Sequence, residues 1–268
     1  MSPAAPLADR DVLDLEAVTV RRGTSVLLDA VDLQVGSGQR WVVLGPNGAG
    51  KSTLVGVAAA RLFPTTGTVG ILGERLGRVD VFELRPRIGL ASTTLAGQVP
   101  GHERVLDVVV TAAYGVTGRW RERYEDADVD RARHLLDLLG VGALGTRAFG
   151  TLSDGERKRT QIARALMTDP ELLLLDEPAG GLDLGGREDL LRRLTALAAD
   201  ADAPTSVMVT HHVEEIPVGT THALLLREGR VVAAGEAPKV LSSKRLSETF
   251  GLSLRLERRG DRFSARAV

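Results

Sequence analysis

One stretch of nine residues constrains this chain more than any other part of its sequence. It reads Gly45-Pro46-Asn47-Gly48-Ala49-Gly50-Lys51-Ser52-Thr53, which fits the pattern G-x-x-x-x-G-K-S. An apolar run at 41–44 comes before it, and a stretch at 54–62 with apolar residues at helical spacing comes after it. The order strand, glycine loop, helix is the context in which this pattern forms a phosphate-binding loop.

The residue types of the loop suit the phosphates of a nucleotide. Glycines let backbone N–H groups turn toward an anion, and the new helix adds its first amides and the positive end of its dipole. Lys51 supplies a mobile charge for the β- and γ-phosphates, and the Ser52 hydroxyl is an oxygen ligand suited to Mg²⁺. A chance glycine-rich turn is the alternative, and it matches this pattern in about one per cent of such chains or fewer. We therefore expect all of 45–53 to surround nucleotide phosphates.

Composition narrows the class of protein. The chain has 268 residues, 43% of them hydrophobic, enough for one large domain or two small ones. Its net charge of −1 gives no overall attraction to nucleic acid, so we expect no nucleic-acid partner. The lack of Cys excludes disulfides and thiolate chemistry. No stretch approaches the roughly 18 apolar residues of a membrane span, and residues 1–10 lack the apolar core of a signal peptide. Any membrane role therefore requires a partner chain.

The order of apolar patterns predicts an α/β fold. Short strands are expected first, in an antiparallel arrangement, at 12–20, 26–28, 31–35 and 40–44. Buried strands then alternate with helices, which indicates a mixed, mainly parallel sheet flanked by helices. The expected strands are 67–73, 88–91, 172–175, 205–210 and 223–226. The expected helices include 51–62, 153–167 and one that follows Gly185-Gly186 and runs to 199. Ser153 with Glu156 three residues later predicts a capping box, and Glu214-Glu215-Ile216 predicts a short helical turn.

Two further parts of the chain have their own character. Helical spacing at 102–114 and 128–139 predicts a helical insertion over 98–150, with a connection rich in Arg and Glu at 115–126. The cluster of Arg119, Trp120, Arg121 and Arg123 in that connection fits an exposed loop, and a partner-contact surface is the alternative. Two helical pieces at 236–250 and a hairpin around Gly260-Asp261 are expected at the end of the chain.

A pair of acids forms a second candidate site. Asp176 and Glu177 directly follow the apolar run 172–175. Because that run is typical of a strand buried on both faces, its acids should lie at the carboxyl edge of the sheet, beside the phosphate loop. Asp176 would hold Mg²⁺, directly or through water, and Glu177 would orient or deprotonate an attacking water. Taken alone, two acids after a strand fit an ordinary loop start equally well.

Five motifs together resemble the ATP-binding-cassette (ABC) ATPases in order and spacing. They are Gly45–Thr53, the Leu-Ser-Asp-Gly-Glu stretch at 152–156, the strand and acids at 172–177, Gly180-Gly181-Leu182-Asp183, and Thr210-His211. The stretch at 152–156 looks like the Leu-Ser-Gly-Gly-Gln signature that separates this family from other phosphate-loop proteins. The resemblance implies a phosphate-loop NTPase fold with an N-terminal antiparallel subdomain. It covers residues 12–240 and implies one nucleotide-binding domain at 1–240, with a core of 12–97 and 151–240 and a short extension at 241–268.

The resemblance also implies a mechanism. Two copies, or this chain and a related cassette, would meet head to tail and enclose two ATP molecules with Mg²⁺. Ser153, Gly155 and Glu156 of one copy would face the ATP held by the phosphate loop of the other, and Asp183 would couple the two sites. His211 would contact the γ-phosphate and the attacking water; its neighbour His212 competes for this role.

Two positions depart from the pattern of the family. The place of an aromatic residue that stacks on adenine is occupied by Arg22, whose guanidinium can stack or can be solvated. The place of a glutamine that links Mg²⁺ to the membrane partner is occupied by Thr93, which offers a hydroxyl at shorter reach. Gln98, five residues later, substitutes only if the loop bends.

The leading hypothesis is an ATPase subunit that powers a separate permease from the cytoplasmic side of the membrane. The helical segment around 105–115 resembles subunits of metal-chelate, cobalamin and molybdate-linked uptake systems. The alternative is a stand-alone ABC ATPase with a regulatory or repair role.

Overall fold

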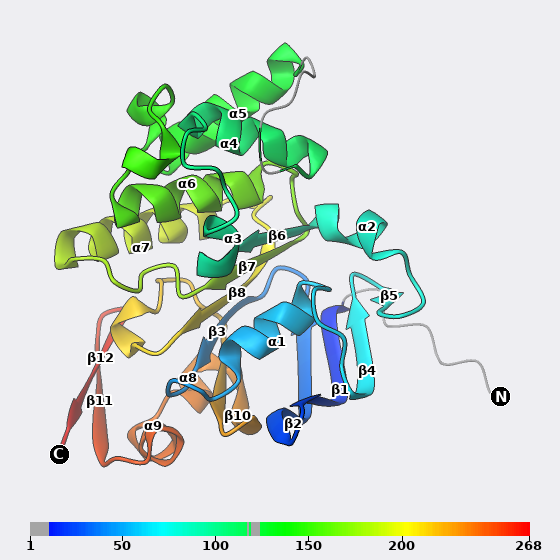
Figure 1. Ribbon diagram of the computed structural model, residues 1–268. Coiled ribbons are helices and arrows are strands. Elements are labelled where there is room, and N and C mark those ends of the chain that lie inside the picture. The colour runs from blue at the N-terminus through cyan, green and yellow to red at the C-terminus, as the bar shows by residue number, and fades with distance from the viewer. Residues whose placement is uncertain (1–10, 117, 119–123) are drawn as a thin grey trace. The chain divides into compact units, whose positions relative to one another are not determined.

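The computed structural model describes residues 11–116, 118 and 124–268 (Figure 1). The predicted cluster of Arg119, Trp120, Arg121 and Arg123 lies outside the described residues, as do residues 1–10. The chain forms two compact units. The first contains residues 11–85 and Thr205–Val268, and the second is Pro86–Pro204, which includes the predicted helical insertion 98–150.

The first unit contains most of the strands and the helix that follows the phosphate loop, together with the elements at the end of the chain. They are β1 (Asp11–Arg22), β2 (Ser25–Gly36), β3 (Arg40–Leu44), α1 (Lys51–Ala58), β4 (Thr66–Ile71), β5 (Glu74–Arg75), α2 (Val81–Leu84), β8 (Thr205–Thr210), the 3-10 turn η5 (Val213–Glu215), β9 (His222–Arg227), β10 (Arg230–Glu236), α8 (Ala237–Val240), α9 (Ser243–Phe250), β11 (Leu254–Arg259) and β12 (Arg262–Ala267).

The second unit contains two strands and most of the helices. They are β6 (Ile88–Ala91), α3 (Thr93–Ala96), α4 (Val105–Val110), η2 (Thr111–Tyr114), α5 (Asp126–Leu138), η3 (Gly142–Leu144), η4 (Phe149–Thr151), α6 (Asp154–Leu166), β7 (Leu172–Asp176) and α7 (Leu184–Ala198). A short turn, η1 (Arg85–Arg87), spans the point where the chain passes from one unit to the other.

The predicted antiparallel opening is confirmed for residues 12–35, which lie in a sheet with strand order β2-β1-β4-β5. The strand expected at 40–44 does not belong to this sheet, because β3 pairs in parallel with β8 and β9. Two short strands were expected at 26–28 and 31–35, but one strand, β2, runs through both. Ala30 has a φ of 48°, and the pairing of β1 with β2 shifts register there, so the apparent break between the two strands is a β-bulge. The Ala30 N–H donates to the Thr19 hydroxyl at 3.0 Å, which satisfies the amide that the bulge releases.

Parallel strands form the central part of the first unit. β3 pairs in parallel with β8 on one side and β9 on the other, and β10 pairs antiparallel with β9. Val42, Val43 and Leu44 are fully buried, as expected for a strand covered on both faces. Leu44 stands opposite Thr210 of β8, so the segments that follow these two strands leave the sheet at one edge.

Helix α1 contacts β2 and β4 of the antiparallel sheet and β8 of the parallel strands (Figure 1). It is shorter than the predicted 51–62 because Ala60 adopts a φ of 52°. The N–H groups of Arg61 and Leu62 then both donate to the carbonyl of Gly56, which closes the helix end.

In the second unit, β6 and β7 pair in parallel, with Ala91 opposite Leu175. Helices α4, α5 and α6 contact one another, as the green part of Figure 1 shows. Arg164 of α6 connects that helix to α4 and the segment after it, because its guanidinium donates to the Val108 carbonyl, to the Thr111 hydroxyl at 2.9 Å and to the Val116 carbonyl at 2.7 Å. Burial lowers the pKa of Arg164 to about 10.

Two helix starts differ from the sequence prediction. The helix expected from 102 begins at Val105, because the backbone of Arg104 bridges to Ala148 and the Val105 N–H donates to the carbonyl of Arg147. Gly185 and Gly186 were expected before a helix but lie in the first turn of α7, because Asp183 is its N-cap.

The end of the chain belongs to the first unit and packs against its other elements. Leu246 of α9 belongs to a buried cluster with Val213 and Ile216, and Phe250, Leu254, Leu256, Phe263 and Ala265 pack against that cluster. The expected terminal hairpin is confirmed as β11 and β12. Among the described residues, no helix has the length and apolar character needed to cross a membrane.

Candidate nucleotide-binding site

The phosphate loop links the end of β3 to the start of α1. A Cβ on Gly45 would collide with the carbonyl oxygen of Leu226, and one on Gly50 would lie 2.5 Å from the carbonyl oxygen of Leu27. Gly50 also has a φ of 102°, a conformation that side chains rarely adopt. The loop therefore requires glycine at both positions, and its backbone lies close to the strands beneath it.

Lys51 and the start of α1 give the loop its electrostatic character. The N-cap of α1 is Gly50, which has no side chain to accept from the first amides of the helix. Lys51 is buried, and its ammonium donates to the carbonyl oxygens of Gly45 at 2.8 Å and Pro46 at 3.0 Å. An uncapped helix start and an enclosed ammonium at one loop form a cradle that fits a phosphate group.

His211 lies at the same edge as the phosphate loop. It directly follows β8, whose last residue, Thr210, stands opposite Leu44 at the end of β3. The two rings of His211 and His212 lie 4.1 Å apart between centroids, and His211 is the less exposed of the two. The parallel register therefore brings the predicted His211 next to the loop that begins at Gly45.

The turn after His211 is held by a buried acid that sequence analysis read only as part of a helical turn. The Thr210 hydroxyl, which is fully buried, donates to the carboxylate of Glu215, and the His212 N–H donates to the same hydroxyl at 3.1 Å. An acid placed five residues after a Thr at a strand end is the only signal that the sequence contains for this pair.

Asp176 and Glu177 lie at the carboxyl edge of β7 in the second unit, as predicted, and both are half-buried. Glu177 has a φ of 50°, which is uncommon for a residue with a side chain and is enriched at functional sites. Thr93 follows β6 at the same edge, because Ala91 stands opposite Leu175.

Thr93 does not lie in an open loop. It begins helix α3, whose N-cap Ser92 accepts from the Leu95 N–H at 3.3 Å. Thr93 and Gln98 are both exposed, and the helical turn of α3 separates them.

Lys158 is a residue that sequence analysis missed. Its ammonium, from α6, donates to the carbonyl oxygen of Glu177 at 3.0 Å and to that of Gly180. It therefore connects the signature helix to the loop that follows the two acids. The only sequence signal is rarity, because Lys occurs at just four positions of this chain.

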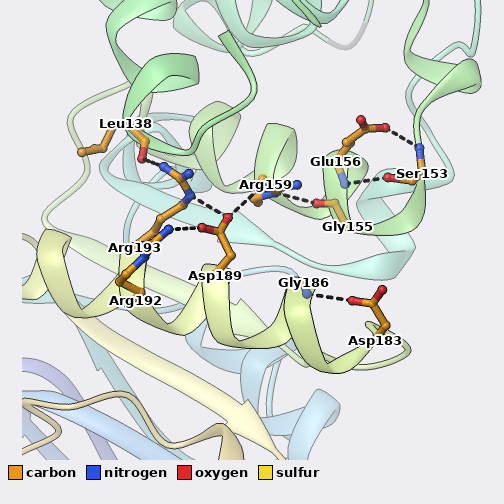
Figure 2. A network of polar contacts seen from close by, with 10 residues as sticks. All are labelled: Leu138, Ser153, Gly155, Glu156, Arg159, Asp183, Gly186, Asp189, Arg192 and Arg193. Atoms are coloured by element: carbon orange, nitrogen blue, oxygen red, sulfur yellow. Dashed lines mark hydrogen bonds and ion pairs between the residues drawn. The ribbon is translucent and has the colours of Figure 1, made fainter. Parts of the chain in front are cut away.

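The signature stretch forms the start of α6, and the predicted capping box is confirmed. The Ser153 hydroxyl accepts from the Glu156 N–H at 3.4 Å, and the Glu156 carboxylate accepts from the Ser153 N–H at 2.7 Å (Figure 2). That backbone hydrogen bond holds the pKa of Glu156 below its usual value. Ser153 is exposed and Gly155 half-buried.

Helix α7, whose N-cap is Asp183, is joined to the signature helix by the ion pair between Asp189 and Arg159 (Figure 2). Asp183 caps α7 by accepting from the Gly186 N–H at 2.7 Å. Asp189, two turns into α7, accepts from Arg159 of α6 at 2.7 Å and from Arg193 at 2.9 Å. Arg193 also donates to the carbonyl of Leu138 at the end of α5, so three helices of the second unit meet at one carboxylate.

Arg22, the residue at the predicted adenine position, is the last residue of β1. It stands opposite Ser25 across a tight turn and is exposed. Its role in base stacking stays a prediction.

Several known proteins are similar to this chain in sequence. Residues 28–180 match the family model described as ABC transporter. A putative ABC transporter ATP-binding protein of Streptococcus mutans is 35% identical over 239 residues, which cover 89% of this chain and 92% of that protein. The uncharacterized ABC transporter ATP-binding protein YlmA of Bacillus subtilis is 38% identical over 240 residues, covering 89% of this chain and 90% of that protein.

A solved structure has the same fold. It is described as an inward-facing conformation of a putative metal-chelate type ABC transporter, and the match has a TM-score of 0.76 at 26% identity. The match covers 96% of each chain.

Proposed function

Since the chain belongs to the ABC transporter family as an ATP-binding subunit, we propose that it hydrolyses ATP and thereby energises a separate membrane permease. The observation that carries the proposal is the cradle at the end of β3. It combines the uncapped start of α1, the buried ammonium of Lys51 and the neighbouring His211 at one sheet edge. A stand-alone regulatory or repair role has no comparable observation in its favour.

The phosphate loop binds the nucleotide through its backbone and Lys51. When phosphates enter, the ammonium of Lys51 exchanges the carbonyl oxygens of Gly45 and Pro46 for the β- and γ-phosphate oxygens. Gly48 and Gly50 supply amides that approach the phosphates without obstruction by side chains.

Ser52 and Asp176 would hold Mg²⁺, with Thr93 as a weaker candidate. Mg²⁺ supplies charge neutralisation at the phosphates when it is bound. The donor set fits, because Mg²⁺ usually takes one or two carboxylates and hydroxyls together with substrate phosphates. Over residues 11–116, 118 and 124–268, no group of three or more acids or histidines forms an all-protein metal cage. A site completed by the nucleotide is consistent with this composition.

Glu177 and His211 would act on the water that attacks the γ-phosphate. Glu177 accepts a proton from that water or orients it, and His211 contacts the γ-phosphate and the water. The unusual backbone conformation of Glu177 supports a functional role, because such conformations persist where the surrounding structure fixes them.

A second copy of the chain, or a related cassette, would complete each site. Ser153, Gly155 and Glu156 at the start of α6 would face the nucleotide of the partner, where helix amides suit an anion. Asp183 would couple the two sites, because the ion pair between Asp189 and Arg159 connects its helix to the signature helix.

The permease would place the chain at the cytoplasmic face of a membrane and would determine the transported substrate. The similarity to a putative metal-chelate type transporter makes metal chelates the first class to test.

Two measurements test the proposal. The purified chain is expected to release phosphate from ATP in the presence of Mg²⁺, and failure to do so under any nucleotide or metal condition contradicts the ATPase assignment. Affinity purification of the tagged chain from detergent-extracted membranes is expected to recover a multi-span membrane protein. Recovery of the chain only from the soluble fraction contradicts the permease assignment.

A further inference from the structure

The turn that follows His211 is hydrogen-bonded to β12, the last strand of the chain. Glu214, in the middle of η5, accepts two hydrogen bonds from β12. Its side-chain Oε1 accepts from the Ala265 N–H at 3.0 Å, and its backbone carbonyl accepts from the Arg262 guanidinium at 2.9 Å. All of these residues belong to the first unit.

The register of the hairpin explains why its two strands form hydrogen bonds with two different neighbours. Leu256 stands opposite Ala265, and in an antiparallel pair such positions alternate between inward and outward hydrogen bonding. Here both N–H groups point out of the ladder. That of Leu256 donates to the Ser243 hydroxyl of α9 at 2.9 Å, whereas that of Ala265 donates to Glu214.

The other edge of the hairpin is fixed at a second point. The Leu254 N–H donates to the Ser247 hydroxyl of α9 at 2.9 Å. Helix α9 itself contacts β9, which is paired with β3, the strand that leads into the phosphate loop. The hairpin is therefore bonded on one side to α9, which packs against the sheet, and on the other side to the turn after His211.

The same turn is closed from inside by Glu215, which accepts from Thr210, and by the Glu215 N–H, which donates to the His212 carbonyl at 3.2 Å. Glu214 links the turn that these internal bonds close to the hairpin. Because the internal bonds hold the turn on one side of Glu214 and the hairpin holds it on the other, the backbone between 210 and 216 has little freedom. The position of His211 therefore depends on where the hairpin holds Glu214.

We propose that the C-terminal hairpin is a positioning element of the ATPase site, which acts through Glu214 on the turn that carries His211. The proposal rests on the ATPase function proposed above. Glu214 and Arg262 are positioning residues that touch no reacting atom. Their role is to keep the His211 ring in its working place, where displacement of about 1 Å can slow a reaction by up to about a hundredfold.

The test compares steady-state ATP hydrolysis by the full-length wild type with that of Glu214→Ala, Glu214→Gln and Arg262→Ala. Glu214→Ala removes the acceptor for the Ala265 N–H, so kcat is expected to fall about three- to tenfold with KM for ATP unchanged, because the phosphate loop is intact. Glu214→Gln keeps an amide oxygen at that place and is expected to restore kcat. Arg262→Ala is expected to lower kcat by about two- to fivefold.

Arg258→Ala is the matched control. In the described part of the chain, the Arg258 guanidinium donates to the Gly260 carbonyl and the Asp261 carboxylate, which both belong to the hairpin. We therefore expect the kcat of Arg258→Ala to stay at the wild-type value. Melting temperatures of all variants are measured in parallel.

The outcomes separate this inference from the proposed function. A wild type without ATPase activity overturns the proposed function and this inference with it. An active wild type whose kcat is retained in Glu214→Ala overturns this inference alone. So does a Glu214→Gln variant as slow as Glu214→Ala, or a loss of kcat matched by an equal rise in KM and a lower melting temperature, because both indicate general loosening of the fold.

Discussion

The ammonium of Lys51 lies 2.8 Å from the carbonyl oxygen of Gly45, the first residue of the loop that the lysine closes. The lysine therefore stabilises the loop in the nucleotide-free chain and, by our proposal, transfers its bonds to phosphate oxygens when ATP binds. The same side chain serves both states, so its removal affects the loop and the ligand together.

Lys51→Ala is expected to weaken ATP binding by about a hundredfold or more, because several charge-assisted hydrogen bonds are lost at once. Isothermal calorimetry with ATP measures the affinity. Lys239→Ala is the control, since Lys239 forms an exposed pair with Glu236. Unchanged affinity in Lys51→Ala would mean that this lysine does not contact the phosphates.

Gly45→Ala is expected to disrupt the loop, because the new methyl group collides with the backbone carbonyl of Leu226. Overpacking of this kind costs about 1–3 kcal/mol, and the melting temperature and the ATP affinity should both fall. Gly97→Ala is the matched control, because its Cβ would meet its nearest atom at 3.7 Å. Wild-type stability and affinity in Gly45→Ala would contradict the close packing of the loop.

Glu177→Gln is expected to bind ATP but to hydrolyse it at least about a hundredfold more slowly, because the amide cannot accept the proton of the attacking water. Size-exclusion chromatography with Mg-ATP should then show an accumulated dimer. Glu171→Gln, which removes the charge of an exposed acid paired with Arg87, should behave as the wild type. A strictly monomeric Glu177→Gln protein would argue against the two-copy site.

Asp189→Asn is expected to lower the free energy of unfolding by about 1–3 kcal/mol at neutral pH, because Arg159 and Arg193 lose their charged acceptor. The hydrogen bond from Arg193 is the main reason that the pKa of Asp189 lies below its ordinary value. Because the folded-state pKa is lowered, this contribution is complete above the ordinary Asp pKa of about 3.9 and is lost as the pH falls through the folded-state pKa.

Thermal unfolding from pH 7 to pH 3 measures this effect. The gap between wild type and Asp189→Asn should narrow as the pH falls below about 4. Asp130→Asn is the control, since Asp130 and Arg133 form an exposed pair whose contribution is about 0–1 kcal/mol. A gap that stays constant across this range would show that the ionised carboxylate contributes nothing.

Arg22→Ala is expected to change ATP affinity by less than about tenfold, or 1.4 kcal/mol, because contacts to the phosphates dominate binding. Arg22 is exposed at the end of β1, which is consistent with a solvated side chain. Calorimetry with ATP and with GTP measures both affinity and base preference. A larger loss that is specific to ATP would indicate stacking of the guanidinium on adenine.

Local sequence patterns were sufficient to predict most of the fold. The strands at 88–91 and 205–210 and the capping box of Ser153 and Glu156 depend on neighbours a few residues apart, and all three are confirmed. Features that depend on distant backbone could not be predicted in this way. The bulge at Ala30 and the late start of α4 at Val105 are examples, because partners far along the chain determine them.

The candidate site shows the same division. The strand-loop-helix pattern was enough to place 45–53, and the parallel register brought His211 beside it. The roles of Lys158 and Glu214 follow from contacts 22 and 51 residues away, to Gly180 and Ala265, and no periodicity or motif encodes such contacts.

The pairing of Leu44 in β3 with Thr210 in β8 limits how this chain can change during evolution. Adding or removing one residue in β3 or β8 would shift the strand by about 3.3 Å and turn every later side chain to the opposite face. Gly45 and His211 would then leave the strands at different heights. These two strands are thus open to changes of residue type but closed to changes of length. Related chains should carry their insertions in turns such as the one at Gly73, where an added Cβ would meet no atom within 4 Å.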